Sequence, residues 1–286
     1  MSPVSKSITL NDGKPMPTVG LGVYLLPLDD CADIVNNALE IGYRHLDSAR
    51  LYGNERETAE GIAKFLKNHP NVKREEIFYT TKIWPTDHGF DATKAALQES
   101  YEDVHKEIQY IDLVLLHDPR SGPKRRLEAY QVLQDAVEKG IVKSIGVSNY
   151  GVHHLEELFS QPWLKIKPAV NQIEINPWCQ QSEIVDYCKK HSIAVQAYSP
   201  LMFGHRLDDP ELVALGKKYN KTSAQILIRW NLQKGFTPLP KTVRTSRLKE
   251  NIDVFDFEIS DEDVAQLGSG KGKYLPGGDD PTIHKP

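Results

Sequence analysis

Short apolar segments alternate with longer amphipathic segments along the whole chain, and this alternation restricts the possible folds more than any other feature. Eight short segments rich in β-branched residues read as strands: Val19–Gly22, Tyr43–Leu46, Ile77–Thr81, Ile111–Leu116, Val142–Val147, Ala169–Ile173, Ala194–Ala197 and Thr237–Leu239. Helical patterns lie near residues 30–40, 55–66, 91–104, 125–139, 152–160, 181–190, 210–233 and 246–252. Parallel strands need crossover connections of this length, so the alternation predicts a parallel sheet with helices between its strands.

The helical segments carry the expected periodicity and end signals. Leu127–Val137 places apolar residues at 127, 130, 133, 136 and 137, which fall on one face of a helix. Gly42 and Gly140 follow two of the helical patterns, and the pattern over 210–233 is interrupted around Asn220. Ser260–Asp263 has the residues of a capped helix start. These signals support the helix assignments.

Eight strand–helix units in about 250 residues are typical of a (β/α)₈ TIM barrel. A doubly wound open sheet also alternates strands and helices and is the alternative architecture. Ahead of the first unit, residues 8–16 indicate a short β-hairpin that turns at Asn11–Gly13. No linker divides the 286 residues, so we expect a single α/β domain over 1–286, with an irregular tail over 268–286.

Composition excludes several classes of protein. The three cysteines, Cys31, Cys179 and Cys188, form no C-x-x-C pair, which argues against a disulfide scaffold and against a structural zinc site. The net charge is −4 with acids and bases interspersed, unlike a nucleic-acid-binding protein. No apolar run is long enough for a membrane span, and the first ten residues lack the apolar core of a signal peptide. We therefore expect a cytoplasmic protein.

Polar and ionisable residues occupy the ends of seven of the expected strands. In chain order these are Asp47, Lys82, His117, Ser148, Asn149, Gln172, Tyr198, Ser199, Lys241 and Thr242. Any one of these residues alone is better explained as a surface residue or as a hydrogen-bonded polar group of the core. Because the carboxyl ends of barrel strands meet at one face, where active sites form, the set together predicts a catalytic barrel.

The residue types at this face suggest proton donation to a carbonyl. Tyr52 lies five residues after Asp47, in the loop at the mouth. A phenol has an unperturbed pKa of about 10, and we expect the Lys82 ammonium, held by Asp47, to lower it. His117 would then orient a substrate oxygen by hydrogen bonding. Since no side chain supplies a hydride, this arrangement implies a nicotinamide cofactor.

No strand in this sequence is followed by a complete G-x-G-x-x-G motif, so a Rossmann cofactor site is not expected. The segment Pro240–Asn251 offers another cofactor site, because it brings Lys241, Arg244, Arg247 and Lys249 to the expected start of a helix. Helix N-termini favour anions. The alternative reading is a basic, solvated helix.

These motifs resemble the aldo-keto reductase family. Gly42–Glu55 is similar to the first family signature, Thr81–Trp84 to the lysine motif and Leu115–Pro119 to the histidine motif. Further similarity covers Gly146–Asn149, Asn171–Pro177 and Pro240–Asn251. The matches follow one another in order from residue 20 to residue 251, so the resemblance covers most of the chain.

The resemblance implies an NADPH-dependent oxidoreductase that reduces aldehydes, ketones or ketoesters. The catalytic residues it implies are Tyr52 as the general acid, Lys82 and Asp47 as the groups that tune it, and His117 as the group that orients the carbonyl. The cofactor-binding residues it implies are Ser148, Asn149, Gln172, Tyr198, Ser199, Leu201, Lys241, Thr242, Val243, Arg247 and Asn251. Tyr24, Trp84 and His117 would line the substrate pocket. Basic groups near the 2′ position of the adenosine ribose favour NADPH/NADP⁺ over NADH, because only NADPH carries a phosphate there.

Two departures from the family pattern bear on the substrate. Asp118 follows the catalytic histidine where many relatives have an aromatic residue, and a carboxylate facing the pocket would disfavour anionic substrates. The short tail after the last strand predicts a shallow, permissive pocket for a small carbonyl substrate.

Two other functions stay open. One is a non-catalytic NADPH-binding barrel that serves as a redox-sensing or regulatory subunit. The other is a barrel hydrolase or isomerase that uses Asp47 and His117 without nicotinamide. We expect no metal site, since His153 and His154 are adjacent and no carboxylate–histidine set has ligand spacing. We also expect a monomer with no nucleic-acid or membrane partner.

Overall fold

Parallel strands form the centre of the computed structural model, which describes residues 6–269, 273–275 and 278–285. Within these residues, eight strands pair in chain order. They are β3 (Leu21–Gly22), β4 (His45–Asp47), β5 (Phe78–Ile83), β6 (Ile111–Leu116), β7 (Val142–Ser148), β8 (Val170–Glu174), β9 (Ala194–Tyr198) and β10 (Thr237–Pro238). The first and last strands meet, because Gly20 N donates to Pro238 O and Gly22 N to Pro240 O, both at 3.1 Å. The sheet therefore closes into a barrel, as the sequence predicted.

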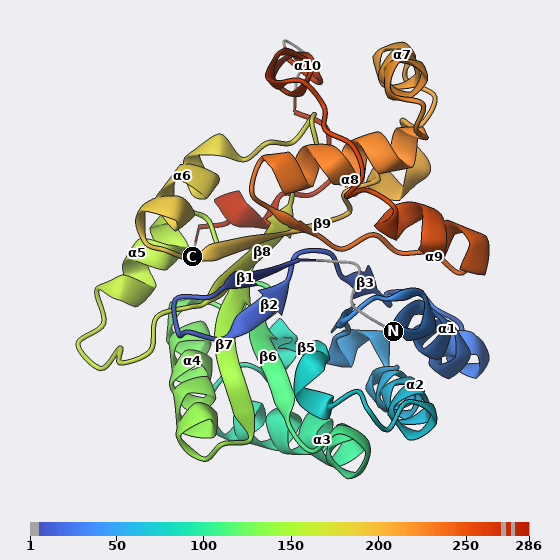
Figure 1. Ribbon diagram of the computed structural model, residues 1–286. Helices are drawn as coiled ribbons and strands as arrows, with labels where there is room; N and C mark the ends of the chain where they lie inside the picture. Colours follow the sequence, from blue (N-terminus) through green and yellow to red (C-terminus); the bar gives the residue numbers. More distant parts are fainter. Residues whose placement is uncertain (1–5, 270–272, 276–277, 286) are drawn as a thin grey trace.

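Helices surround the strands (Figure 1). They are α1 (Leu28–Ile41), α2 (Glu55–Asn68), α3 (Phe90–Ile108), α4 (Pro123–Glu138), α5 (Val152–Phe159), α6 (Ser182–Lys190), α7 (Pro210–Tyr219), α8 (Ser223–Gln233), α9 (Thr245–Ile252) and α10 (Asp261–Gln266). The interruption expected around Asn220 is the break between α7 and α8, where Asn220 takes a left-handed conformation with φ of 51°. Helix α3 continues to Ile108, beyond the expected end, because Ile108 is itself buried in the core.

The N-terminal hairpin covers the amino-terminal end of the barrel. Strands β1 (Ser7–Thr9) and β2 (Pro15–Pro17) pair antiparallel, and Gly13 has the positive φ of 83° that their turn requires. Leu10 and Met16 of the hairpin are buried against Phe78, Leu113 and Leu115. The hairpin therefore closes the apolar, amino-terminal end of the barrel interior.

The opposite, carboxyl end of the barrel has a polar interior. Lys82, Gln172 and Gln196 come from three different strands, and all are at most 2% exposed. The larger hydrophobic core lies outside the barrel, where residues such as Val114 and Ile145 are buried with apolar residues of the surrounding helices. Buried polar groups concentrated at the strand ends identify this end of the barrel as the candidate site.

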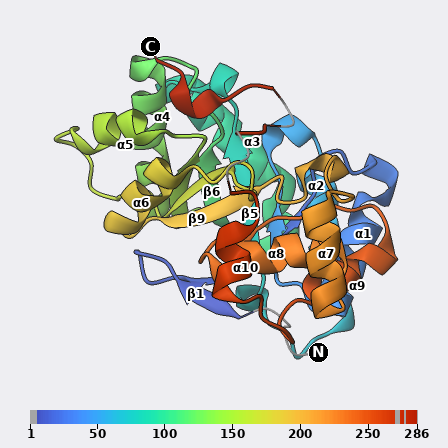
Figure 2. The same cartoon turned by 90° about the horizontal axis from the view of Figure 1, so that it is seen from above.

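The described part of the C-terminal segment lies against the loops at this end of the barrel. Tyr274 N donates to Trp178 O at 2.8 Å, and residues Pro281–Ile283 form a 3₁₀ helix in which Thr282 is 4% exposed. After this 3₁₀ helix, His284 O contacts His153 Nε2 of α5 at 2.9 Å, and Figure 2 shows the C-terminal segment on the same side of the molecule as α4 and α5. Residues 270–272, 276–277 and 286 of the expected irregular tail lie outside the described residues.

None of the helices in the described part of the chain is both long enough and apolar enough to cross a membrane. Cys31, Cys179 and Cys188 are all buried and free.

Candidate active site

Three of the four expected catalytic side chains meet around the ammonium group of Lys82. Lys82 lies in β5 and is fully buried. Its Nζ donates to Oδ1 of Asp47, at the end of β4, over 2.5 Å and to the backbone oxygen of Ser48 over 2.8 Å. A third contact, of 3.4 Å, runs to Oη of Tyr52. The ammonium thus joins the carboxylate to the phenol.

A hydrogen-bonded loop holds the phenol of Tyr52 over Lys82. Tyr52 ends the short 3₁₀ helix Arg50–Tyr52, and Gly53 follows with a φ of 65°, which glycine adopts without strain. Ser48 Oγ donates to Asn54 Oδ1 at 2.8 Å, and Asn54 Nδ2 donates to Val23 O at 2.9 Å. Because Asn54 is fully buried, both ends of the loop are fixed to the barrel.

Aromatic side chains surround the catalytic groups. His117, which follows β6, lies with its ring centroid 5.8 Å from that of Tyr52 and nearly perpendicular to it, at 77°. Trp84 packs edge-on against His117 at 4.9 Å, and Tyr24 contacts Tyr52 at 4.8 Å. The two residues expected to line the substrate pocket, Tyr24 and Trp84, therefore lie directly beside the expected proton donor and the expected orienting histidine.

The protonation states follow from burial. Burial and the neighbouring Lys82 hold the pKa of His117 well below its ordinary value, so the imidazole is neutral near pH 7. Burial also lowers the pKa of Lys82, and the Asp47 carboxylate opposes this. Burial, followed by the charge of Asp47, raises the pKa of Tyr52 well above 10. The phenol is therefore protonated near pH 7, and the effect expected of the Lys82 ammonium on its pKa stays a prediction.

A second group of expected residues continues from Asp47 along β7, β8 and β9. Gln172 Nε2 donates to Asp47 Oδ2 at 2.8 Å, and Ser148 Oγ donates to the backbone oxygen of Gln172 at 2.8 Å. Asn149, with a φ of 64°, donates from Nδ2 to His117 O at 3.0 Å and accepts from Tyr198 Oη at 2.9 Å. Ser148, Asn149, Gln172 and Tyr198 thus form one network adjoining the catalytic groups.

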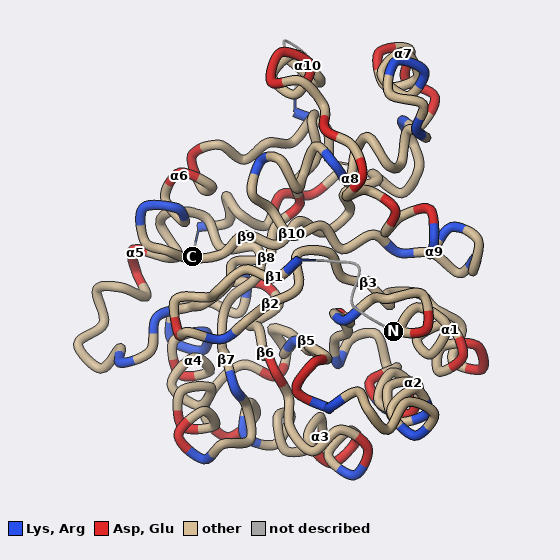
Figure 3. The backbone as a smooth tube through the Cα atoms, in the orientation of Figure 1, with Lys and Arg blue, Asp and Glu red and all other residues tan. Residues whose placement is uncertain are grey.

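Basic side chains gather where β10 leads into α9 (Figure 3). Lys241, Arg244 and Arg247 are exposed, and no ion pair within the described residues engages them. Thr242 is buried and accepts the Arg244 N–H through Oγ1 at 3.0 Å, while Asn251 of α9 is 3% exposed and Val243 is 47% exposed. Cations without an ion-pair partner at a helix N-terminus suit the binding of an anionic group.

The loop after β9 carries the two other expected cofactor residues, Ser199 and Leu201. Ser199, Met202 and Phe203 have positive φ values of 47°, 51° and 53°. Among the described residues, no hydrogen bond joins Ser199 or Leu201 to Asp47, Tyr52, Lys82 or His117. The loop follows a strand of the site, but it makes no hydrogen bond to the catalytic groups among the described residues.

Two residues that hold the site, Gln196 and Asn54, were not singled out from the sequence. Gln196 accepts from Gln172 Nε2 at 2.7 Å, and Asn54 anchors the loop of Tyr52. Gln196 precedes Tyr198 by two positions and so shares its side of β9, which is a signal the sequence offers. Asn54 is part of the Gly42–Glu55 motif, but an asparagine is common in loops, so its residue type gives no signal of its structural role.

Asp118 does not present a free carboxylate to the site. Its side chain is 2% exposed and accepts from the backbone N–H and Nε of Arg120, both at 2.9 Å. Arg120 also pairs with Asp279 of the C-terminal segment. The Asp118 carboxylate is thus paired with the Arg120 guanidinium.

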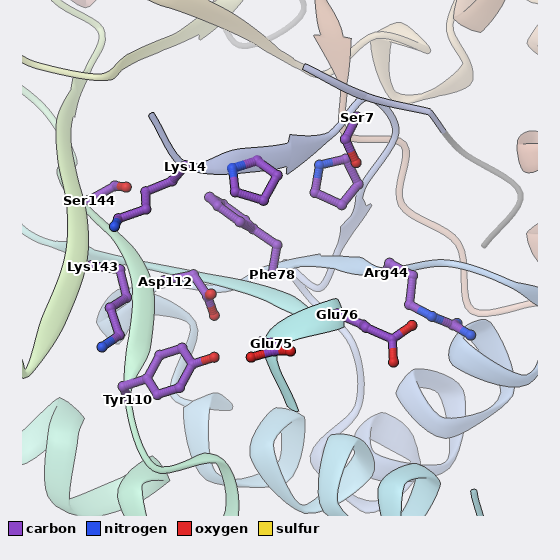
Figure 4. A pocket seen from close by; sticks show the side chains of 12 residues that line it. Ser7, Lys14, Arg44, Glu75, Glu76, Phe78, Tyr110, Asp112, Lys143 and Ser144 are labelled. Carbon is purple, nitrogen blue, oxygen red and sulfur yellow. The ribbon is translucent and has the colours of Figure 1, made fainter. Parts of the chain in front are cut away.

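A large cavity of about 710 Å³ lies at the other end of the barrel (Figure 4). Its walls come from residues that precede or begin strands, among them Arg44, Phe78, Tyr110 and Lys143. None of the expected catalytic or cofactor residues lines it. Residues at this end of a barrel serve stability rather than catalysis, so the cavity is not the candidate site. Across the described ranges, no group of three or more His, Cys, Asp and Glu side chains is placed to hold a metal ion.

Comparison with known proteins gives a consistent result. The model of the aldo/keto reductase family matches residues 20–269. An uncharacterized oxidoreductase of Saccharomyces cerevisiae is 47% identical over 265 residues, which are 92% of this chain and 94% of the relative. Glyoxal reductase of Bacillus subtilis is 40% identical over 262 residues, 91% of each chain. The crystal structure of a Bombyx mori aldo-keto reductase in complex with NADP matches with a TM-score of 0.85 and 38% identity, over 92% of both chains. The chain therefore belongs to the aldo-keto reductase family of oxidoreductases, enzymes that act on carbonyl and alcohol groups.

Proposed function

We propose that this enzyme is a single-domain, NADPH-dependent reductase of aldehydes, ketones or ketoesters. The observation that carries the proposal is the contact of Lys82 Nζ with both Asp47 and Tyr52, beside the neutral ring of His117. A phenol that stays protonated near pH 7 next to a neutral imidazole suits a site that binds and protonates a carbonyl oxygen.

His117, Tyr52 and Lys82 would have different roles at the carbonyl oxygen of the substrate. His117, neutral because its pKa is held low, donates a hydrogen bond to the oxygen and orients it. Tyr52 Oη transfers its proton to the same oxygen as negative charge develops there. Lys82, fixed by Asp47, stabilises the charge that the phenol acquires. When bound, the reduced nicotinamide cofactor supplies the hydride that completes the conversion of carbonyl to alcohol.

The cofactor would be held by two groups of residues. Ser148, Asn149, Gln172 and Tyr198 would take the nicotinamide end, and Ser199 and Leu201 the pyrophosphate. Lys241, Thr242 and Arg247 would take the 2′-phosphate, with Val243 beside it and Asn251 near the adenine. The unpaired charges of Lys241 and Arg247 support NADPH over NADH, because only NADPH carries the additional phosphate.

The aromatic residues at the mouth of the barrel support a class of substrate rather than one compound. Tyr24 and Trp84 give the mouth apolar aromatic walls, which suit a small carbonyl compound with an apolar substituent. The similar enzyme of Bacillus subtilis is named for glyoxal, so dicarbonyl compounds belong in the same test.

The test is the oxidation of NADPH, followed by absorbance, with a panel of aromatic aldehydes, aliphatic aldehydes, dicarbonyls and ketoesters. NADH is measured in parallel. We expect turnover with several aldehydes and a clear preference for NADPH. NADPH binding without turnover on any member of the panel would instead favour a redox-sensing subunit. Absence of NADPH binding would exclude the proposed reductase.

All the residues assigned to this reaction come from one chain, so we propose that the monomer is the active form. Sedimentation at assay concentrations tests this. The three buried, free thiols suit a reducing compartment, and we propose a cytoplasmic location.

A further inference from the structure

Glu55 is a buried carboxylate close to the candidate active site that no step of the proposed reaction uses. It is the first residue of α2 and is 6% exposed. Its Oε1 accepts from Thr81 Oγ1, and its Oε2 accepts from Ser100 Oγ of α3 at 3.1 Å. In the described ranges no cation forms an ion pair with it. A buried acid held only by neutral hydroxyls is costly to keep charged, which calls for an explanation.

The position of Glu55 relative to Lys82 follows from the strand between them. Thr81 immediately precedes Lys82 in β5, and successive side chains of a strand point to opposite faces. Lys82 faces the barrel interior, where it meets Asp47. Thr81 faces the surrounding helices, where it meets Glu55. Carboxylates thus lie on both sides of β5 at the level of the catalytic lysine.

The carboxylates of Asp47 and Glu55 both affect the pKa of Lys82. Burial lowers the pKa of Lys82, while first Asp47 and then Glu55 oppose that effect. Burial raises the pKa of Glu55 itself to about 7, against the hydrogen bonds from Thr81 and Ser100.

The other charged or titratable groups facing Glu55 come from three elements. Arg50, before α2, favours the charged carboxylate, and Asp103 of α3 disfavours it. Tyr79 of β5 lies near enough that the Glu55 charge contributes to its raised pKa, after the larger effect of burial. Arg50 also pairs with Glu99 at 2.7 Å, so its charge is shared with a residue other than Glu55.

We propose that Glu55 is a positioning residue for proton donation: its carboxylate, held behind β5 by Thr81 and Ser100, keeps Lys82 charged and so keeps Lys82 bound to the phenol of Tyr52. This role rests on the proposed function for its kinetic effect, but the effect on Lys82 exists without substrate. Glu55 touches neither Tyr52 nor Asp47 and acts through Lys82.

The negative charge of Glu55 raises the pKa of both Lys82 and Tyr52. A charged Glu55 stabilises the Lys82 ammonium and disfavours the negatively charged phenolate of Tyr52. Removal of the carboxylate therefore lets Lys82 lose its proton, and Tyr52 lose its own, at lower pH. Both changes move the alkaline loss of reductase activity to lower pH. At pH values where Glu55 is already protonated, its removal changes no charge.

The first experiment observes Lys82 directly in the full-length protein, without substrate. Lysine labelled with ¹⁵N is followed by NMR as a function of pH, with Lys82→Met used to assign the Lys82 resonance. We expect the wild-type Nζ signal to show a small inflection near pH 7, where Glu55 titrates while Lys82 stays protonated. In Glu55→Gln this inflection disappears and the pKa of Lys82 falls, by about half a unit or more.

Glu174→Gln is the matched control, because Glu174 of β8 is also buried and burial also raises its pKa to about 7. It does not act on Lys82, so the inflection and the pKa of Lys82 should both persist. A wild-type signal with no inflection near pH 7 overturns the proposal, and this test needs no variant of Glu55 to fold. An inflection that survives in Glu55→Gln, or vanishes in Glu174→Gln, also overturns it.

The second experiment compares kcat of the wild type and Glu55→Gln, with NADPH and an accepted aldehyde, from pH 6 up to a pH at which the wild type has lost most of its activity. We expect similar values at pH 6 and a deficit that grows to about threefold on the alkaline side, which corresponds to a shift of half a pH unit. A deficit that is equal at every pH would indicate a structural role and overturn the proposal. If the wild type reduces no carbonyl compound, the proposed function fails, while the NMR experiment still decides the role of Glu55.

Discussion

Lys82 Nζ donates to Tyr52 Oη over 3.4 Å, a longer bond than the 2.5 Å contact that the same ammonium makes with Asp47. The phenol oxygen acts as the acceptor in this bond, because an ammonium group can only donate. The hydroxyl proton of Tyr52 is consequently free to be donated elsewhere. The lysine therefore holds the phenol in place without using the proton that the proposed reaction needs.

Replacement of Tyr52 by Phe should abolish most of the reductase activity and spare cofactor binding. A positioned general acid contributes about 10²–10⁴-fold to a rate, so we expect kcat to fall by at least about 100-fold. The Kd for NADPH, measured by fluorescence quenching, should stay close to the wild-type value. Tyr110→Phe, at the opposite end of the barrel, is the control and should retain activity. Substantial turnover by Tyr52→Phe would remove this residue from the role of acid.

Replacement of Arg247 by Ala should weaken the binding of NADPH far more than that of NADH. A hydrogen bond to a charged group contributes about 1.5–3 kcal/mol, so the loss for NADPH should be roughly tenfold or more. Titrations of both cofactors, monitored by fluorescence, measure the difference. Arg56→Ala removes an exposed arginine of α2 and should change neither affinity. Equal losses for the two cofactors would show that Arg247 does not contact the 2′-phosphate.

The buried histidines should make the protein less stable as the pH falls below about 6.5. Burial lowers the pKa of His45 and of His88 to about 4. Between pH 6.5 and pH 4 the unfolded chain therefore binds protons that the folded chain does not, and the free energy of unfolding decreases as pH falls. Each such histidine contributes a slope of about 1.4 kcal/mol per pH unit in this window.

The buried glutamates act in the opposite sense. Glu55 and Glu174 have pKa values raised to about 7, so between pH 7 and their ordinary pKa the folded chain binds the additional protons and gains stability as pH falls. A single variant separates the two effects. His88→Gln keeps a donor and an acceptor near Ser121 and Ile83, the partners of His88. Urea denaturation at pH 5, 6 and 7 should give this variant a smaller loss of stability on acidification than the wild type. Identical slopes would contradict a neutral His88.

Replacement of Arg120 by Ala should destabilise the protein through Asp118. The Asp118 carboxylate is buried, and Arg120 supplies its side-chain donors. Loss of these donors leaves a buried charge with fewer partners, a change that costs about 1–3 kcal/mol; the partial exposure of Arg120 favours the lower end of this range. Addition of Asp118→Asn to Arg120→Ala should recover part of the loss. In a denaturation cycle over the four proteins, additive effects would exclude the coupling.

The barrel could be predicted from the sequence because its strands are buried on both faces and its helices on one. Ile111–Leu116 is apolar except for Asp112 and forms β6 with the same bounds, and Asn220 marks the break between α7 and α8 as expected. The number of strand–helix units favoured a closed barrel, but the residues that pair at its closure could not be predicted in this way. Closure depends on backbone hydrogen bonds of Gly20 and Gly22 to Pro238 and Pro240, and such bonds leave no pattern in side chains.

The candidate site was predictable where its residues stand at strand ends, as Asp47 and Lys82 do. The properties of the site were less predictable where tertiary packing decides the protonation state of a residue or its interaction partner. The raised pKa of Tyr52 depends on its burial beside Asp47, and the pairing of Asp118 with Arg120 depends on a turn of two residues. Glu55 belongs to the motif Gly42–Glu55, yet its contact with Ser100 joins positions 45 residues apart. No local pattern in the sequence reports such a contact.

The seam between Gly22 and Pro240 has a consequence for synthesis on the ribosome. The segment that bears Asp47, Tyr52 and Lys82 is made early, but its outer strand, β3, has no neighbour on one side until residue 240 has been translated. Up to that point the nascent chain carries an unpaired strand edge, the kind of surface to which chaperones and other chains bind. The same late step brings Lys241 beside Gly22 of β3. The ability to retain NADPH should therefore appear only when the barrel has closed, so that cofactor capture reports completion of the fold.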